Sequence, residues 1–119
     1  MDDTNQAVVL VVEDEPFILL NTVDYLESSG LLVLEAVNAA IALRILETRP
    51  DITHLFSDID LPGPINGLEL ATLVRQRRPE VGIILTSGHM LPNSFELPDG
   101  VAFFPKPYRL TDVCERIAS

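Results

Sequence analysis

The stretch "AVVLVV", residues 7–12, determines which class of fold this chain can adopt. It is a continuous apolar run rich in valine, and such runs are typical of β-strands that are buried on both faces. Strands of this kind belong to parallel sheets, because the helices that connect parallel strands cover both faces of the sheet. Pro16 then opens a helical stretch that Gly30 ends, since proline suits the first turn of a helix and glycine the residue beyond its end. The sequence therefore begins with a predicted strand followed by a helix.

The same alternation continues along the chain. Further apolar runs predict strands at residues 31–36, 52–57, 81–86 and 101–104. Apolar residues recur at helical spacing after the second, third and fifth strands, and Asn38 can cap the second predicted helix. Five buried strands separated by helices predict a single α/β domain over residues 1–119, with helices on both faces of a parallel sheet.

Composition narrows the possible partners. The 119 residues include 18 Asp and Glu against 8 Lys and Arg, a net charge of −10 that argues against direct binding of nucleic acid. The same charge permits a divalent cation or a basic protein surface. Cys114 is the only cysteine, which excludes an intramolecular disulfide and favours a reducing, cytoplasmic compartment. No apolar stretch approaches 18 residues, so no insertion into a membrane is expected.

Polar side chains follow the predicted strands. Glu13 and Asp14 come directly after the first strand, Asp58 after the third, Thr86 near the end of the fourth, and Lys106 just past the fifth. The carboxyl ends of parallel strands meet at one edge of the sheet, which is where such sheets bind ligands. We therefore expect these side chains to meet in one pocket.

The set of residue types suits phosphoryl chemistry. Three carboxylates in one pocket repel each other unless a positive charge compensates them, and Mg²⁺ prefers hard oxygen ligands of this kind. A carboxylate can itself be a nucleophile and form an aspartyl phosphate. Attack on phosphorus requires neutralisation of the phosphoryl oxygens, to which Mg²⁺, the Lys106 ammonium and the Thr86 hydroxyl could all contribute.

Four motifs, in order, resemble the CheY-like receiver domain of two-component response regulators. They are "VVEDE" (11–15), "SDIDLPGPINGLEL" (57–70), "ILTSG" (84–88) and "FFPKPY" (103–108), and the similarity covers the whole chain. The resemblance implies a flavodoxin-like, doubly wound, three-layer sandwich with strand order 2-1-3-4-5. It also implies Mg²⁺, or another divalent cation such as Mn²⁺, as the cofactor.

The resemblance assigns a role to each residue of the pocket. Asp58 is implied as the phospho-acceptor and Lys106 as the lysine that binds the phosphate. The implied metal ligands are the acidic pair Glu13 and Asp14, Asp58, and the backbone carbonyl of Asp60.

Further implied features concern the switch. Thr86 is the implied switch hydroxyl and Phe103 the aromatic residue that moves with it, in place of the more frequent tyrosine. A cis peptide bond is implied between Lys106 and Pro107. Pro92 and Pro98 leave little room for a regular fourth helix. Residues 89–99 are therefore expected to be mostly irregular, with at most a short helical turn.

The implied function is signalling rather than enzymatic turnover. The phosphodonor would be a histidine kinase or a phosphotransfer domain, and the output would pass to an unknown protein partner. Two alternatives stay open: an adaptor that keeps the fold without being phosphorylated, and a haloacid-dehalogenase-like phosphatase, which the Asp-x-Asp pattern of residues 58–60 resembles. The full set of acids, threonine and lysine argues against the first. The placement of residues 58–60 after the third strand argues against the second.

Overall fold

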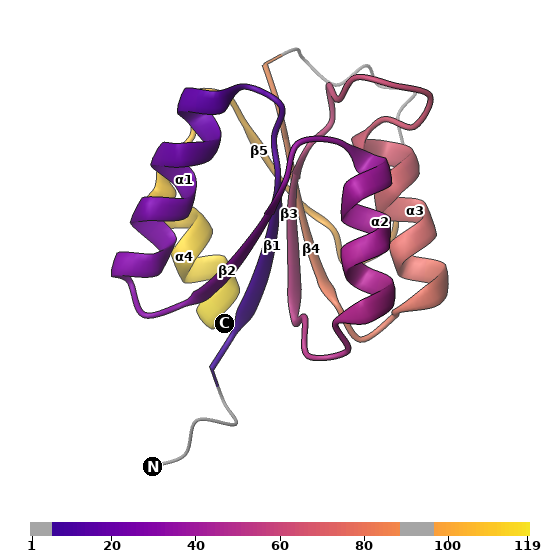
Figure 1. Cartoon of the computed structure of the whole chain (residues 1–119). Coiled ribbons are helices and arrows are strands. Elements are labelled where there is room, and N and C mark those ends of the chain that lie inside the picture. Colours follow the sequence, from indigo (N-terminus) through magenta and orange to yellow (C-terminus); the bar gives the residue numbers. More distant parts are fainter. Residues whose placement is uncertain (1–5, 89–96) are drawn as a thin grey trace.

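The computed structural model describes residues 6–88 and 97–119, and in that part of the chain five strands and four helices form (Figure 1). The strands are β1 (Val8–Val12), β2 (Leu32–Ala36), β3 (His54–Asp58), β4 (Gly82–Ser87) and β5 (Ala102–Pro105). They form one sheet in the order β2-β1-β3-β4-β5, and every neighbouring pair is parallel. The predicted flavodoxin-like, doubly wound fold and its strand order are confirmed.

Two helices cover each face of the sheet. The helices are α1 (Pro16–Ser28), α2 (Ala39–Thr48), α3 (Gly67–Arg77) and α4 (Leu110–Ala118). Figure 1 shows α1 and α4 together on one face and α2 and α3 together on the other. This three-layer arrangement leaves the carboxyl ends of the strands at one edge, between the two pairs of helices.

Side-chain caps fix where three of the helices begin. Glu15 accepts hydrogen bonds from two backbone N–H groups at the start of α1, and Asn38 accepts one at the start of α2, as its position predicts. Asn66 and Glu69 form a reciprocal capping box at the start of α3. These caps satisfy N–H groups that a helix leaves unpaired, and they anchor the loops that leave the carboxyl ends of the strands.

The centre of the sheet is buried on both faces. All five residues of β1 are buried, and they alternate between two hydrophobic layers. Leu10 packs in the layer under α2 and α3, whereas Val9 and Val11 pack in the layer under α1 and α4. This confirms the prediction that the run at residues 7–12 is covered on both sides.

The prediction of five buried strands is wrong for the two edges of the sheet. Leu32 and Glu35 of β2 are exposed, and β5 has no residue that is fully buried. Both strands lie at an end of the sheet and have a hydrogen-bonded neighbour on one side only. An apolar run such as residues 31–36 therefore indicates a strand, but not its place in the sheet.

The predicted short or irregular helix at residues 89–99 lies mostly outside the described residues. Leu97 and Pro98 have no regular structure, and a turn at Asp99 and Gly100 leads into β5. None of the helices in residues 6–88 and 97–119 combines the length and the apolar character that crossing a membrane requires.

Candidate functional site

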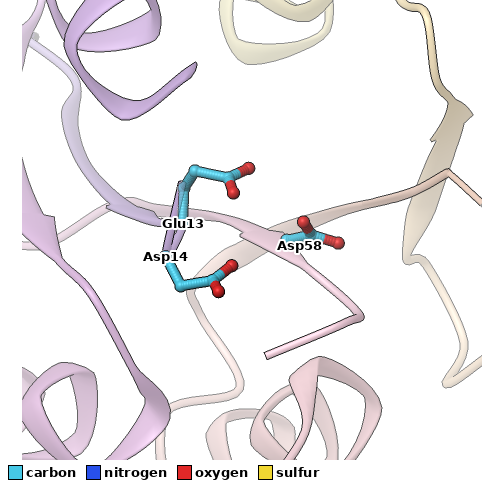
Figure 2. A group of neighbouring side chains, drawn as sticks. All are labelled: Glu13, Asp14 and Asp58. Atoms are coloured by element: carbon cyan, nitrogen blue, oxygen red, sulfur yellow. The ribbon is translucent and has the colours of Figure 1, made fainter. Parts of the chain in front are cut away.

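Three carboxylates meet where β1 and β3 end. Asp58 is the last residue of β3, and Glu13 and Asp14 directly follow β1, its neighbour in the sheet. One carboxylate oxygen from each of the three lies within 4.8 Å of the others (Figure 2). Glu13 and Asp58 are both only 4% exposed, whereas Asp14 is exposed. The predicted acidic pocket is thus present, with one side open to solvent.

Lys106 is the positive partner of this pocket. Its Nζ lies 2.8 Å from Oδ2 of Asp58 and 3.5 Å from Oε1 of Glu13. Burial lowers the pKa of Lys106, but the hydrogen bond and charge of Asp58, with the charge of Glu13, outweigh burial and raise the pKa above its ordinary value. Lys106 is therefore charged at neutral pH. The peptide bond between Lys106 and Pro107 is cis.

Asp58 is held through both of its carboxylate oxygens. Oδ2 accepts the hydrogen bond from Lys106, and Oδ1 accepts one of 2.9 Å from the backbone N–H of Asp60. The close approach of α3 to the end of β3 fixes the backbone here as well, because the N–H of Gly67 donates to the carbonyl of Ile59 at 2.9 Å. The orientation of Asp58 is thus set before any ligand arrives.

The side chain of Glu13 is held by a hydrogen bond, but its surroundings disfavour its negative charge. Its Oε2 accepts a hydrogen bond of 3.0 Å from the backbone N–H of Glu15. Burial raises the pKa of Glu13, the hydrogen bond from Glu15 partly offsets this, and the charge of Asp58 raises it further. The pocket therefore favours additional positive charge.

The donor set fits a divalent cation. The pocket offers carboxylate oxygens from three residues, one of which is exposed to solvent. This set matches the requirements of Mg²⁺, which binds through one or two carboxylates, waters and a phosphate. Asp60 lies two residues beyond Asp58, and its carboxylate accepts a hydrogen bond of 2.8 Å from Ser87. The ligand role predicted for its backbone carbonyl stays a prediction.

Thr86 lies opposite Asp58 in the register of β3 and β4. It is 2% exposed, and its hydroxyl oxygen has no hydrogen-bond partner in the described part of the chain. A buried hydroxyl without a partner costs free energy, so it is poised to bond an atom that arrives beside it. A cavity of about 10 Å³ adjoins it and is lined by Glu13, Asp58, Thr86 and Tyr108, among others.

Phe103 lies in β5, one residue before the residue that pairs with Thr86 of β4. It pairs with Leu85, and it packs half-buried against the layer under α2 and α3. Thr86 instead pairs with Phe104, which packs in the layer under α1 and α4. Thr86 and Phe103 thus come from adjacent strands, but their positions in the sheet belong to opposite faces.

Two contributors to the site had no predicted role. Tyr108 packs edge-to-face on Phe56, with ring centroids 5.4 Å apart, and burial raises the pKa of its phenol although a hydrogen bond with Thr22 partly offsets this. Ser87 binds the carboxylate of Asp60. The sequence places Ser87 at the end of a strand, beside Thr86, but nothing in the sequence pairs it with a residue 27 positions away.

Comparisons with known proteins agree on one family. The family model described as "Response regulator receiver domain" matches residues 9–118. The sensor protein TorS of Escherichia coli K12 is 31% identical over 112 residues, which are 87% of this chain and 12% of TorS. The chain thus spans about an eighth of that relative's length.

Solved structures share the fold closely. A CheY-like response regulator receiver domain protein from Methanospirillum hungatei superposes with a TM-score of 0.86 at 29% identity, covering 96% of this chain and 92% of that one. The response regulator TrrA from Thermotoga maritima, solved in complex with Mg²⁺ and BeF, gives a TM-score of 0.84 at 25% identity, covering 95% of this chain and 97% of that one.

Proposed function

Because the chain belongs to the response regulator receiver domain family of two-component signalling, we propose that it accepts a phosphoryl group on Asp58 and signals by a change of conformation. The observation that carries this proposal is the geometry around Asp58. Its carboxylate is 4% exposed, bonded to Lys106 at 2.8 Å, and opposite a buried Thr86 hydroxyl that has no partner in the described residues. We propose further that residues 1–119 form one receiver domain.

The proposed reaction is a displacement at phosphorus. A carboxylate oxygen of Asp58 forms the new bond to phosphorus as the bond from phosphorus to the donor breaks. The leaving group, a histidine nitrogen or the acetate oxygen of acetyl phosphate, takes the electron pair of the broken bond. Lys106 and Thr86 then stabilise the phosphoryl oxygens, one by its charge and one by donating a hydrogen bond. Hydrolysis returns Asp58 to a carboxylate and releases inorganic phosphate.

Glu13, Asp14 and Asp58, with the carbonyl of Asp60, would hold Mg²⁺ or Mn²⁺ in this proposal, with Glu13 the more distant ligand. The cation supplies charge that offsets both the acidic cluster and the phosphoryl group. The 4.8 Å grouping of the three carboxylates supports this, as does the Mg²⁺–BeF complex of TrrA.

The partners follow from the family. Receiver domains take phosphoryl groups from histidine kinases, so the proposed donor is a histidine kinase or a phosphotransfer domain, and the sequence relative TorS is itself a sensor protein. We propose that an unknown protein partner binds residues 89–99, Phe103 and the exposed side of α4, and that this surface carries the output signal.

The single cysteine suits a reducing, cytoplasmic compartment. No observation favours an adaptor that is not phosphorylated.

Intact-mass measurement tests the proposal. With acetyl phosphate and Mg²⁺, the wild-type protein should gain the mass of one phosphoryl group, and Asp58→Asn should gain none. Asp51→Asn is the matched control, because Asp51 is an exposed aspartate paired with Arg49 and should leave the gain intact. An equal gain in the wild type and Asp58→Asn would refute the assignment.

A further inference from the structure

The end of β4 is hydrogen-bonded to the loop after β3 and to Lys106. The carbonyl of Thr86 accepts a hydrogen bond of 2.8 Å from the N–H of Ile59, on the loop after β3. The Ser87 hydroxyl donates one of 2.8 Å to Oδ2 of Asp60, on the same loop. The carbonyl of Ser87 accepts one of 2.9 Å from the N–H of Lys106. Ser87 itself is 3% exposed, and its bond to the exposed Asp60 is partly buried.

Asp60 is correspondingly held from two sides. Its backbone N–H donates to Oδ1 of Asp58, and its carboxylate accepts from Ser87. A hydroxyl that donates to a carboxylate makes a strong, charge-assisted hydrogen bond. Asp60 is exposed and precedes residues 61–65, which form no helix or strand. The bond from Ser87 therefore helps to hold Asp60 in place.

We propose that Ser87 is a positioning residue for the divalent cation, acting through Asp60. The inference rests on the proposed function, in which Asp60 supplies a backbone carbonyl to the cation. A ligand that is already ordered binds more tightly, because less conformational entropy is lost on binding. Outer partners of metal ligands typically change metal affinity by 10- to 100-fold, so Ser87→Ala should raise the Mg²⁺ dissociation constant roughly tenfold.

Magnesium titration of a small set of variants tests the inference. Lys106 is the only lysine in the chain, so lysine labelled with ¹⁵N gives one backbone signal beside the site, to be followed as Mg²⁺ is added. Asp60→Asn keeps an oxygen that can accept from Ser87, whereas Asp60→Ala removes the acceptor. Ser87→Ala should therefore weaken Mg²⁺ binding roughly tenfold in the wild-type and Asp60→Asn backgrounds and have no further effect in the Asp60→Ala background.

Thr53→Val is the control for loss of a structural hydroxyl. Thr53 makes hydrogen bonds with Val8 and His54, where β1 and β3 begin, at the end of these strands far from the site. Loss of its hydroxyl should therefore lower the melting temperature without changing the Mg²⁺ affinity. If Ser87→Ala behaves like Thr53→Val, or if its effect persists in the Asp60→Ala background, the inference is wrong. Failure of the wild-type protein to bind Mg²⁺ would instead refute the metal site of the proposed function.

Discussion

The ammonium nitrogen of Lys106 lies 2.8 Å from Oδ2 of Asp58, although 48 residues separate the two along the chain. The sheet makes this contact possible, because β4 lies between β3 and β5 and all three strands end at the same edge. Lys106 is charged and partly buried, with its side chain 24% exposed. It compensates two of the three acids, Asp58 and Glu13, before any cation binds.

Replacing Lys106 by methionine should weaken both the fold and the chemistry. Loss of the amine leaves Asp58 and Glu13 buried beside each other, which should destabilise the metal-free protein by about 2 kcal/mol. Phosphorylation by acetyl phosphate should slow at least about tenfold, since the phosphoryl oxygens lose a compensating charge. Urea unfolding and a mass time course measure the two effects. Arg109→Met is the control, because Arg109 is exposed and makes no side-chain cap hydrogen bond; an equal effect of both variants would contradict the role of Lys106.

Replacing Glu13 by glutamine should stabilise the metal-free protein at neutral pH. Burial, together with the charge of Asp58, raises the pKa of Glu13, so its protonated form favours the folded state. This stabilisation is fully present below the pKa of an unfolded glutamate, about 4.3, and is lost as pH rises through the higher pKa of the folded protein. Glutamine cannot ionise and keeps an acceptor for the N–H of Glu15.

The expected gain from Glu13→Gln is about 1 kcal/mol at pH 7 in EDTA, and it should vanish below about pH 4. Urea unfolding at the two pH values measures it. Mg²⁺ should stabilise the wild type more than the variant, because the variant has lost a carboxylate of the site. Glu27→Gln, on the exposed side of α1, should change little in either condition. A gain that is independent of pH would show that the effect does not come from the ionisation of Glu13.

Gly67→Ala should disturb the end of β3 directly. A Cβ at this position would overlap the carbonyl oxygen of Asp58 and lie 2.6 Å from Cα of Ile59, and neither backbone atom can move without shifting the end of the strand. Destabilisation by about 3 kcal/mol is expected, with weaker Mg²⁺ binding. Gly88→Ala is the comparison, since its nearest neighbour would be Cδ of Lys106 at 3.9 Å, an ordinary contact. Equal urea midpoints for the two variants would disprove the steric argument.

Arg78 should matter for stability and not for the site. Its guanidinium donates to the carbonyls of Leu46, Arg49, Pro50 and Ile52, which follow or end α2, and it pairs with Glu80. The last carbonyls of a helix have no donor within the helix, and the guanidinium supplies donors to carbonyls in and just after the last turn of α2.

Arg78→Ala should cost about 3 kcal/mol, because several hydrogen bonds to a charged donor are lost. The neighbouring Arg77→Ala should stay within about 0.5 kcal/mol, since Arg77 is exposed. Calorimetric unfolding compares the two, and Mg²⁺ affinity should match the wild type in both. A loss of Mg²⁺ affinity in Arg78→Ala would mean that the two ends of the sheet are coupled.

The fold was predictable because its signals are local. The valine-rich run before Glu13 and the helical spacing after Pro16 are read within a few residues, and the remaining strands begin and end within two residues of their predicted bounds. The site was predictable for a related reason. Once the sheet is parallel, residues at the ends of strands must meet at one edge, so Asp58 and Lys106 are brought together by topology alone.

What could not be predicted depends on contacts between distant segments. The exposure of Glu35 follows from the place of β2 at an edge, which is a property of the whole sheet and not of the run itself. The bond from Ser87 to Asp60 and the contacts of Arg78 with carbonyls 26 to 32 residues away need side-chain positions in space. Serine and arginine occur on many surfaces, so their residue type alone does not indicate these roles.

Locating the phosphoryl group on one residue tests the central claim most directly. The protein is treated with acetyl phosphate and Mg²⁺ and then with sodium borohydride, which reduces an aspartyl phosphate to homoserine and leaves free carboxylates unchanged. Peptide sequencing by mass spectrometry should find homoserine in place of Asp58, with Asp14 and Asp60 unmodified. Homoserine at either of those two aspartates, or at no aspartate in a protein that has gained the phosphoryl mass, would contradict the assignment of Asp58 as the acceptor.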